Sequence, residues 1–318
     1  MSQCSTGPDF SSGFPAFVSA GDILTDLVRV GSPGAPSATS QWLAHPGGAG
    51  WNVARAVARL GVPSACAGAL GTDCFSDDLW TASVAAGLDM RFLQRVERAP
   101  LLAIVHDTNP PAYFFMGEHS ADLAFDPARL PDGWRAHLKW AHFGGISLAR
   151  QPLGETLATL AADLRAAGAS ISFDPNYRNP MAHGYEPMLR RMAALADLIK
   201  VSDEDLRMLF PGRDEAGAIA ALRAMNPSAT VLVTRGAARA TLFAGDDVIE
   251  AAPPRVDVVD TVGAGDASIG GMLFSLMSAP QRAPRAHLGF ALAAGAAACR
   301  RAGAHSPSLD EVVALLDD

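Results

Sequence analysis

The apolar positions of the chain follow two alternating patterns. Short runs with the composition of buried strands lead into polar turns, and longer stretches with helical periodicity lie between several of them. The runs with strand character are 17–20, 65–70, 140–143, 170–173, 197–201 and 230–233, and the stretches with helical character are 53–60, 76–86, 153–167, 286–301 and 310–316. Strands that alternate with helices form parallel βαβ units, so the pattern predicts an α/β fold with a mostly parallel central sheet.

One region interrupts this alternation. Short strands follow one another there without a helix, at 92–96, 101–106 and 113–116, and Asn109-Pro110-Pro111 separates the last two. A second, small sheet is the simplest explanation for them. We therefore expect one domain over 1–318, with a β-sheet lid inserted as two segments at about 24–45 and 91–118.

Composition and charge narrow the class of protein. The 318 residues are 49% apolar and 18% charged, which is typical of a globular protein with a large core. A formal net charge of −8 argues against nucleic acid as the main partner, because phosphate backbones require a basic surface. The four cysteines form no Cys-x-x-Cys pair and the eight histidines show no metal-binding spacing, so we expect neither a disulfide framework nor a zinc site.

The start of the chain and its longest apolar stretch bear on location. Residues 1–15 have neither the positively charged start nor the apolar segment of a signal peptide. The stretch 288–299 is too short to span a bilayer. We expect a cytoplasmic protein without a membrane partner.

The most informative stretch is 256–277, which we interpret as a strand, a tight glycine turn and a helix. Its centre is Asp260-Thr261-Val262-Gly263-Ala264-Gly265-Asp266. A helix that begins near Ala264 leaves its first amide groups free, and together with the helix dipole they form an anion site. Asp266 would repel an anion that stays there, but it can accept a proton from a hydroxyl that attacks a phosphoryl group in transit. The alternative is structural, because an acid in a first helical turn favours the dipole in any protein.

Other polar residues follow the ends of predicted strands, where open α/β sheets bind ligands. Asp26 stands in an apolar context, and Arg178 ends Asp174-Pro175-Asn176-Tyr177-Arg178. Each could instead be a solvated loop residue. Gly47 and Gly48 precede Asn52 at the start of a helix, where adjacent glycines either mark a turn or let a polyhydroxy ligand approach the backbone.

Several of these motifs together resemble one known family. The heptapeptide 260–266 is similar to the Asp-Thr-x-Gly-Ala-Gly-Asp signature of the ribokinase-like sugar kinases, the phosphofructokinase-B family. The segment that begins at Gly47 resembles the family's Gly-Gly-x-x-x-Asn-x-Ala signature, and 115–122 resembles the Phe-Tyr-Gly-Glu-x-x-Ala-Asp run of its fructokinases. The resemblance extends along nearly the whole chain. It implies a three-layer α/β/α fold with a β-sheet lid, and an ATP-dependent kinase that acts on a primary hydroxyl of a small sugar.

The resemblance also implies a role for each matching residue. The catalytic group is Asp266 as the base, with Gly263, Ala264 and Gly265 supplying amides to the moving phosphoryl group. The sugar would contact Asp26, Gly47, Gly48, Asn52, Phe115 and Arg178, and the nucleotide would contact Ser202, Thr234, Gly236, Gly263 and Gly265. Asp205 would lie near Mg²⁺ through water, and Asp260 near a monovalent cation such as K⁺.

Some positions depart from the family pattern. Asp205 replaces a usual Glu, Arg239 replaces a Gly of the nucleotide turn, and Leu292 stands near where an Asn often lies beside adenine. These departures motivate a second hypothesis, a sugar- or nucleotide-binding regulator that has lost turnover. A P-loop kinase or a Rossmann dehydrogenase is not expected, because their glycine motifs are missing from the sequence.

The motifs favour fructose as the acceptor. 2-Keto-3-deoxygluconate, ribose and a nucleoside remain alternatives, although Leu24 stands where ribokinases commonly have Asn. A lid sheet can also pair with a second subunit, so a homodimer through the lid is a further expectation.

Overall fold

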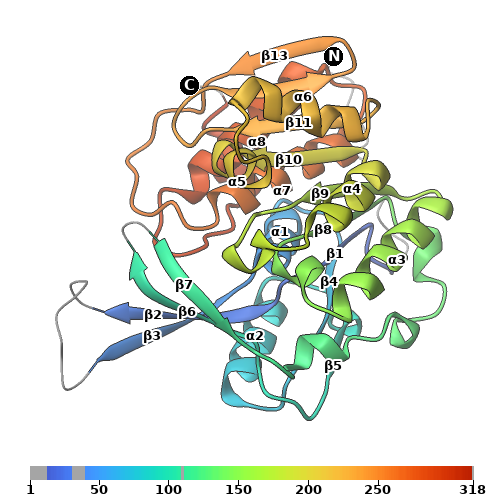
Figure 1. Cartoon of the computed structure of the whole chain (residues 1–318), viewed down its shortest axis with the longest axis vertical. Coiled ribbons are helices and arrows are strands. Elements are labelled where there is room, and N and C mark those ends of the chain that lie inside the picture. The colour runs from blue at the N-terminus through green and yellow to red at the C-terminus, as the bar shows by residue number, and fades with distance from the viewer. Residues whose placement is uncertain (1–12, 31–39, 109–110, 317–318) are drawn as a thin grey trace, which may run out of the picture.

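The computed structural model describes residues 13–30, 40–108 and 111–316, which form a large sheet between helices and a smaller sheet beside it (Figure 1). Within these residues the large sheet has nine strands in the order β13-β12-β11-β10-β9-β8-β1-β4-β5. Their bounds are β1 Phe17–Ala20, β4 Ser64–Leu70, β5 Leu93–Arg95, β8 Trp140–Gly144, β9 Ser170–Asp174, β10 Leu198–Ser202, β11 Thr230–Thr234, β12 Ala240–Ala244 and β13 Asp247–Ala251. From β5 to β11 neighbouring strands run parallel, and β12 and β13 continue the sheet antiparallel. The expected mostly parallel sheet is confirmed.

Helices cover both faces of this sheet. One apolar core joins it to α3 Leu153–Ala166, α4 Glu186–Leu195, α5 Asp203–Leu209 and α6 Glu215–Met225. The other core joins it to α1 Ala49–Arg59, α2 Cys74–Ala85, α7 Ala264–Ser278 and α8 Pro284–Ala298, with α9 Leu309–Val313 packed on α8. The strands are apolar toward both cores, as parallel strands buried on two faces must be. The three-layer arrangement is confirmed.

In the described residues no helix has the length and apolar character needed to cross a membrane.

The second sheet projects from the body as a lid (Figure 1). It has four strands in the order β3-β2-β6-β7, with the bounds β2 Leu24–Val30, β3 Gln41–Gly47, β6 Leu102–Thr108 and β7 Pro111–Met116. Asp26 lies opposite Ala103, which lies opposite Phe115. Because side chains directly opposite one another share a face, Asp26 and Phe115 point to the same side of the lid.

The strand expected at 92–96 belongs to the large sheet and not to the lid. Leu93–Arg95 pairs in parallel with β4, where Gly68 lies opposite Leu93. Phe92 and Leu93 are buried in the two cores of the body. Burial of these side chains decides the pairing, because strand composition alone cannot select a partner sheet.

The segment 256–259 was expected to be a strand, and this expectation is wrong. Val258 and Val259 are 60% and 63% exposed. The amides of Val259 and Asp260 donate to the carbonyl of Cys299 at the end of α8. The backbone groups are satisfied there and not by a neighbouring strand, so the β-branched composition does not produce sheet pairing.

Candidate active site

The start of α7 provides free amide donors. Gly263, its N-cap, adopts a left-handed backbone with φ 77°, and a Cβ there would lie 2.9 Å from Ala304. Both constraints favour glycine at this turn. Within the described part of the chain the amides of Gly265 and Asp266 donate to no backbone or side-chain acceptor. They are available to an anion. The amide of Ala264, which the sequence also led us to expect as a donor, is not available, because it donates to the carbonyl of Thr261 over 3.2 Å.

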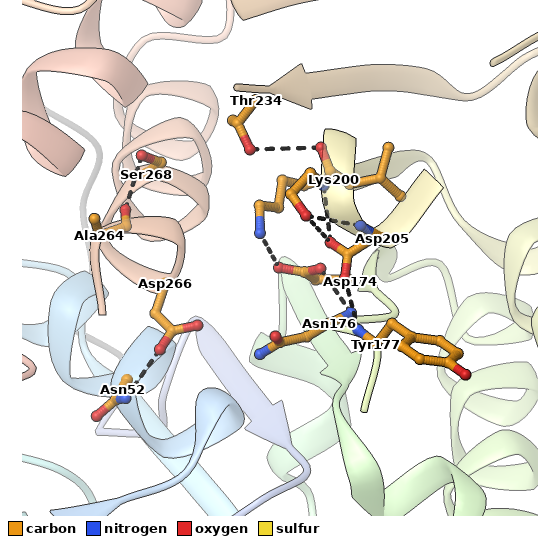
Figure 2. Close-up of polar contacts among 12 residues, drawn as sticks. Asn52, Asp174, Asn176, Tyr177, Lys200, Asp205, Thr234, Ala264, Asp266 and Ser268 are labelled. Atoms are coloured by element: carbon orange, nitrogen blue, oxygen red, sulfur yellow. Dashed lines mark hydrogen bonds and ion pairs between the residues drawn. The ribbon is translucent and has the colours of Figure 1, made fainter. Parts of the chain in front are cut away.

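Asp266 is held in place by Asn52. The Nδ2 of Asn52, on α1, donates to the Oδ2 of Asp266 over 2.9 Å (Figure 2). Asn52 is only 8% exposed. Burial raises the pKa of Asp266 to about 7, although the Asn52 hydrogen bond and the Lys200 ammonium both act to lower it. A carboxyl group with a pKa near neutrality is suited to accept and release a proton.

The lid brings a second carboxylate to the same region. Asp26, on β2, lies against Gly47 at the end of β3, where a Cβ would come within 2.2 Å of Oδ2 of Asp26. Burial raises the pKa of Asp26 to about 6, opposed by the charge of Arg178. Gly48 then caps α1, which carries Asn52. Gly47 and Gly48 thus connect the lid directly to α1, the helix whose Asn52 binds Asp266.

Arg178 faces the lid. Its guanidinium lies over the ring of Tyr113, 5.7 Å from the centroid, and donates to the carbonyls of Asn176 and Tyr177. Tyr113 in turn packs edge-to-face on Phe115. The charge of Arg178 acts on Asp26 and Asp266, so the structure brings the predicted sugar-side residues into one electrostatic neighbourhood.

The ends of β10 and β11 carry the predicted nucleotide residues. Ser202 caps α5 in a reciprocal arrangement, in which Asp205 accepts hydrogen bonds from the amide and hydroxyl of Ser202. The other oxygen of Asp205 accepts from the amide of Tyr177 over 2.7 Å. Thr234 Oγ1 donates to the carbonyl of Val201 over 3.5 Å, and Gly236 turns with φ 52°. The described contacts give Ser202 and Asp205 a structural task, and their contact with a nucleotide or metal stays a prediction.

Asp260 connects two loops beside the start of α7. One oxygen accepts from the amide of Val262 over 3.0 Å and the other from the amide of Gly303 over 2.8 Å. Among the described residues no group of three His, Cys, Asp or Glu side chains could by itself hold a metal ion.

The sequence analysis missed one buried ion pair. Lys200 on β10 donates to Asp174 at the end of β9 over 2.8 Å (Figure 2). The signal was present in the sequence as a lysine inside the otherwise apolar run 198–201. A charged residue in such a run is rarely buried without a partner.

These features define a class of protein. Free amides at a helix start can hold an anionic group, and a buried carboxyl beside them can take a proton from a hydroxyl. This is the equipment of a phosphotransferase with an alcohol acceptor. Residues 16–311 match the model of the pfkB family carbohydrate kinases, and the chain belongs to that family. It is a phosphotransferase that acts on a sugar hydroxyl.

Individual relatives agree with this. The chain is 32% identical over 294 residues to a fructokinase of Escherichia coli, covering 89% of this chain and 93% of the relative. It is 33% identical over 265 residues to an aminoimidazole riboside kinase of Salmonella typhimurium, covering 81% and 80%. The structure of a fructokinase with bound ATP from Xylella fastidiosa superposes with a TM-score of 0.84 at 30% identity, covering 95% of this chain and 98% of that one.

Proposed function

We propose that this chain is an ATP-dependent fructokinase that phosphorylates a primary hydroxyl of fructose. The observation that carries the proposal is the placement of Asp266, whose carboxylate is fixed by Asn52 directly beside the free amides of α7. The relatives named as fructokinases and the ATP-bound neighbour support both substrates. We treat 1–318 as one kinase domain with the lid inserted in it.

The residues would divide the reaction between them. Asp266 accepts the proton of the sugar hydroxyl as its oxygen bonds to the γ-phosphorus of ATP, and the bond from that phosphorus to the β–γ bridging oxygen breaks to release ADP. The free amides of Gly265 and Asp266, at the turn that Gly263 and Ala264 form, stabilise the charge of the group in transit. Gly47, Gly48, Asn52 and Asp26 hold sugar hydroxyls, Phe115 and Arg178 cover the sugar from the lid side, and Ser202, Thr234 and Gly236 contact the nucleotide.

Acceptor choice is the finer part of the proposal. The Asp174–Arg178 and 115–122 runs resemble those of fructokinases. The aminoimidazole riboside kinase is as similar to the chain as the fructokinase is, so a riboside is the first competing acceptor, followed by ribose and 2-keto-3-deoxygluconate.

Two cations belong to the proposal. Mg²⁺ would neutralise charge on the ATP phosphates, and Asp205 would hold one of its waters. The Asp205 carboxylate accepts two hydrogen bonds on one oxygen and one on the other, so the second oxygen still has a free lone pair for that water. Asp260 would lie beside a K⁺ ion, because it fixes the loop that leads into α7. We also propose that the protein works in the cytoplasm, and that two copies associate through the lid.

The test is ADP release measured over fructose, ribose, aminoimidazole riboside and 2-keto-3-deoxygluconate, with MgATP and with K⁺ present or replaced by tetramethylammonium. Fructose should give the highest kcat/KM. Asp266→Ala should lower kcat by roughly 10²–10⁴ with fructose binding retained, which is the usual contribution of a general base.

A matched control is Asp310→Ala, because Asp310 is also an acid in a first helical turn but is exposed on α9. It should leave turnover unchanged. If no sugar released ADP while fructose and ATP both bound, the protein would be the regulator suggested by the changes at Asp205, Arg239 and Leu292. Near-normal turnover in Asp266→Ala would remove the base assignment.

A further inference from the structure

The buried pair of Lys200 and Asp174 faces the catalytic helix because of strand periodicity. Ile199 and Val201 belong to the core on the α3 and α4 side, whereas Leu198 belongs to the core on the α1 and α7 side. Lys200 therefore points toward α7, since successive side chains on a strand alternate between faces. Asp174 ends the neighbouring parallel strand, and its side chain meets the Lys200 ammonium over 2.8 Å.

The ammonium of Lys200 reaches the start of α7. A Cβ on Gly265 would lie 3.1 Å from Nζ of Lys200. The side chain is only 6% exposed, and that of Asp174 only 3%. In Figure 2 Lys200 and Asp174 lie across from Asp266, with Asn52 on the other side of that carboxylate. The cation thus sits where the free amides of Gly265 and Asp266 begin.

Every charged group that acts on Lys200 belongs to this neighbourhood. Burial by itself would lower the pKa of Lys200, but the carboxylates of Asp174, Asp205 and Asp266, from β9, α5 and α7, together raise it. Lys200 therefore stays a cation. Arg178, from the loop after β9, is the other positive charge that acts on Asp266.

A purely structural pair is the competing explanation. Removing two charges from water costs several kcal/mol per ion, and replacing a buried pair with apolar residues is often neutral or stabilising. A pair kept only for stability would have no reason to lie at the carboxyl ends of the strands, against the one helix start that carries the reacting acid. Its position indicates a task in the reaction.

We propose that Lys200 is a positioning residue of the phosphoryl transfer, whose buried ammonium is shared between Asp174 and the start of α7 so that Asp266 remains an anion ready to accept the sugar's proton. The inference rests on the proposed kinase function. Burial pushes Asp266 toward its neutral form, the charge of Lys200 acts to lower its pKa, and the charge of Asp174 opposes Lys200 more weakly. A nearby cation can lower the pKa of a carboxyl by about 1–3 units. Lys200 therefore opposes desolvation, which is the largest effect that raises the pKa of Asp266.

The experiment compares the wild-type enzyme with Lys200→Met over pH 5.5–9.5, with fructose and MgATP saturating. A rise of about one unit from a pKa near 7 reduces the ionised fraction of Asp266 at pH 7 from about one half to about one tenth. We expect a roughly fivefold lower kcat at pH 7, recovery toward the wild-type rate near pH 9, and a fructose KM within about threefold. Carbon-13 NMR titration of Asp266 should show the same shift without any turnover.

Two further variants separate charge from folding. Asp174→Asn combined with Lys200→Met removes both charges, so the melting temperature should return toward wild type. Asp174 raises the pKa of Asp266 less than Lys200 lowers it, so the acid limb of the pH–rate profile should stay displaced in the same direction, by less than in Lys200→Met alone. Lys200→Arg keeps a cation, so the acid limb of its pH–rate profile should lie at the same pH as in the wild-type enzyme.

The control is Arg165→Met, which breaks the partly exposed ion pair with Asp197 at the other end of β10 and should shift nothing. A folded double variant with an unmoved limb, or a loss equal at every pH, would overturn the proposal. The NMR titration decides it even if fructose is not the acceptor, so failure of the kinase assignment remains a separate result.

Discussion

At the scale of single residues, the chemistry depends on how Asp266 is surrounded. Desolvation and the charge of Asp174 favour its neutral form. Three neighbours oppose this, the amide of Asn52, the ammonium of Lys200 and the guanidinium of Arg178. Desolvation is the largest effect and leaves the pKa at about 7, about three units above the ordinary value of 3.8. A base poised near the working pH combines a useful ionised fraction with enough basicity to take a proton.

The first prediction concerns pH. As the proposed base, Asp266 must be deprotonated to act. Because its pKa lies at about 7, kcat/KM for fructose should fall as pH drops through about 7. Rates measured from pH 5 to 9 would show this acid limb. Asp26, with a pKa of about 6, is the other buried acid of the acceptor side. Asp26→Asn should raise the fructose KM but keep the limb near 7, and a limb that moved or vanished in this variant would assign it to Asp26.

At the scale of elements, the joint between β3 and α1 aligns the lid with the catalytic helix. β3 ends at Gly47 and α1 begins at Ala49, so one residue separates a lid strand from the helix that bears Asn52. The close contact of Gly47 with Asp26 fixes the acceptor-side carboxylate relative to that joint.

Gly47→Ala is the prediction that belongs to this joint. The new Cβ would lie 2.2 Å from Oδ2 of Asp26, so the carboxylate must move away from the sugar. We expect the fructose KM to rise about tenfold or more, which corresponds to about 1.4 kcal/mol, with the ATP KM little changed. Steady-state kinetics with each substrate varied would measure this.

Gly289→Ala is its matched control. A Cβ there would meet Leu316 at 4.0 Å, an ordinary contact, and alanine favours a helix interior over glycine. Both KM values should stay at wild type. If Gly47→Ala bound fructose normally, Asp26 would have no part in acceptor binding.

The sequence predicted the elements whose signal is local. The alternating strands, the helix at Ala264 and the glycine turn before it are all present, because periodicity and glycine placement act within a few residues. Prediction from the sequence failed where the structure of a segment depends on contacts with residues far away in the chain. Leu93–Arg95 joins β4 through burial, and 256–259 forms no strand because the carbonyl of Cys299 accepts from the amides of Val259 and Asp260.

The same limit applies to the site. Asp266, Asn52 and Asp26 were predicted from the sequence and its resemblance. The structure joins Asn52 to Asp266 by a hydrogen bond, and the charge of Arg178 acts on both Asp266 and Asp26. The Lys200–Asp174 pair could not be predicted, because its meaning depends on the register of β9 against β10 and on the helix that lies above them. Strand alternation placed Lys200 on a face, but only the fold shows which element covers that face.

At the scale of the whole molecule, the outer face of the lid is apolar and exposed. Trp42, Phe114 and Met116 are 40%, 51% and 53% exposed. By the alternation of side chains along β3 and β7, these three residues lie on the face of the lid opposite to Asp26 and Phe115. They therefore point away from the site. An exposed apolar face of this kind supports the proposed association of two copies through the lid.

Light scattering after gel filtration should therefore give about twice the chain mass of 33.1 kDa. Phe114→Glu places a charge on the apolar face, at its edge strand β7, and should give the monomer mass. Val248→Glu is the control, since Val248 is 60% exposed on β13 and lies outside the lid. A wild-type monomer, or a dimer that survives Phe114→Glu, would place the contact elsewhere or exclude it.

The lid is assembled from two separate parts of the gene product. β2 and β3 come before α1, β6 and β7 come after β5, and the parallel pair of β2 and β6 joins the halves. A protein engineer who wished to transplant the lid of another sugar kinase would have to exchange both stretches together. One junction would have to lie beside Gly47, where β3 of the lid leads directly into α1 with Asn52. A change of acceptor preference through the lid would thus require the exchange of the β2–β3 and β6–β7 segments as a matched pair.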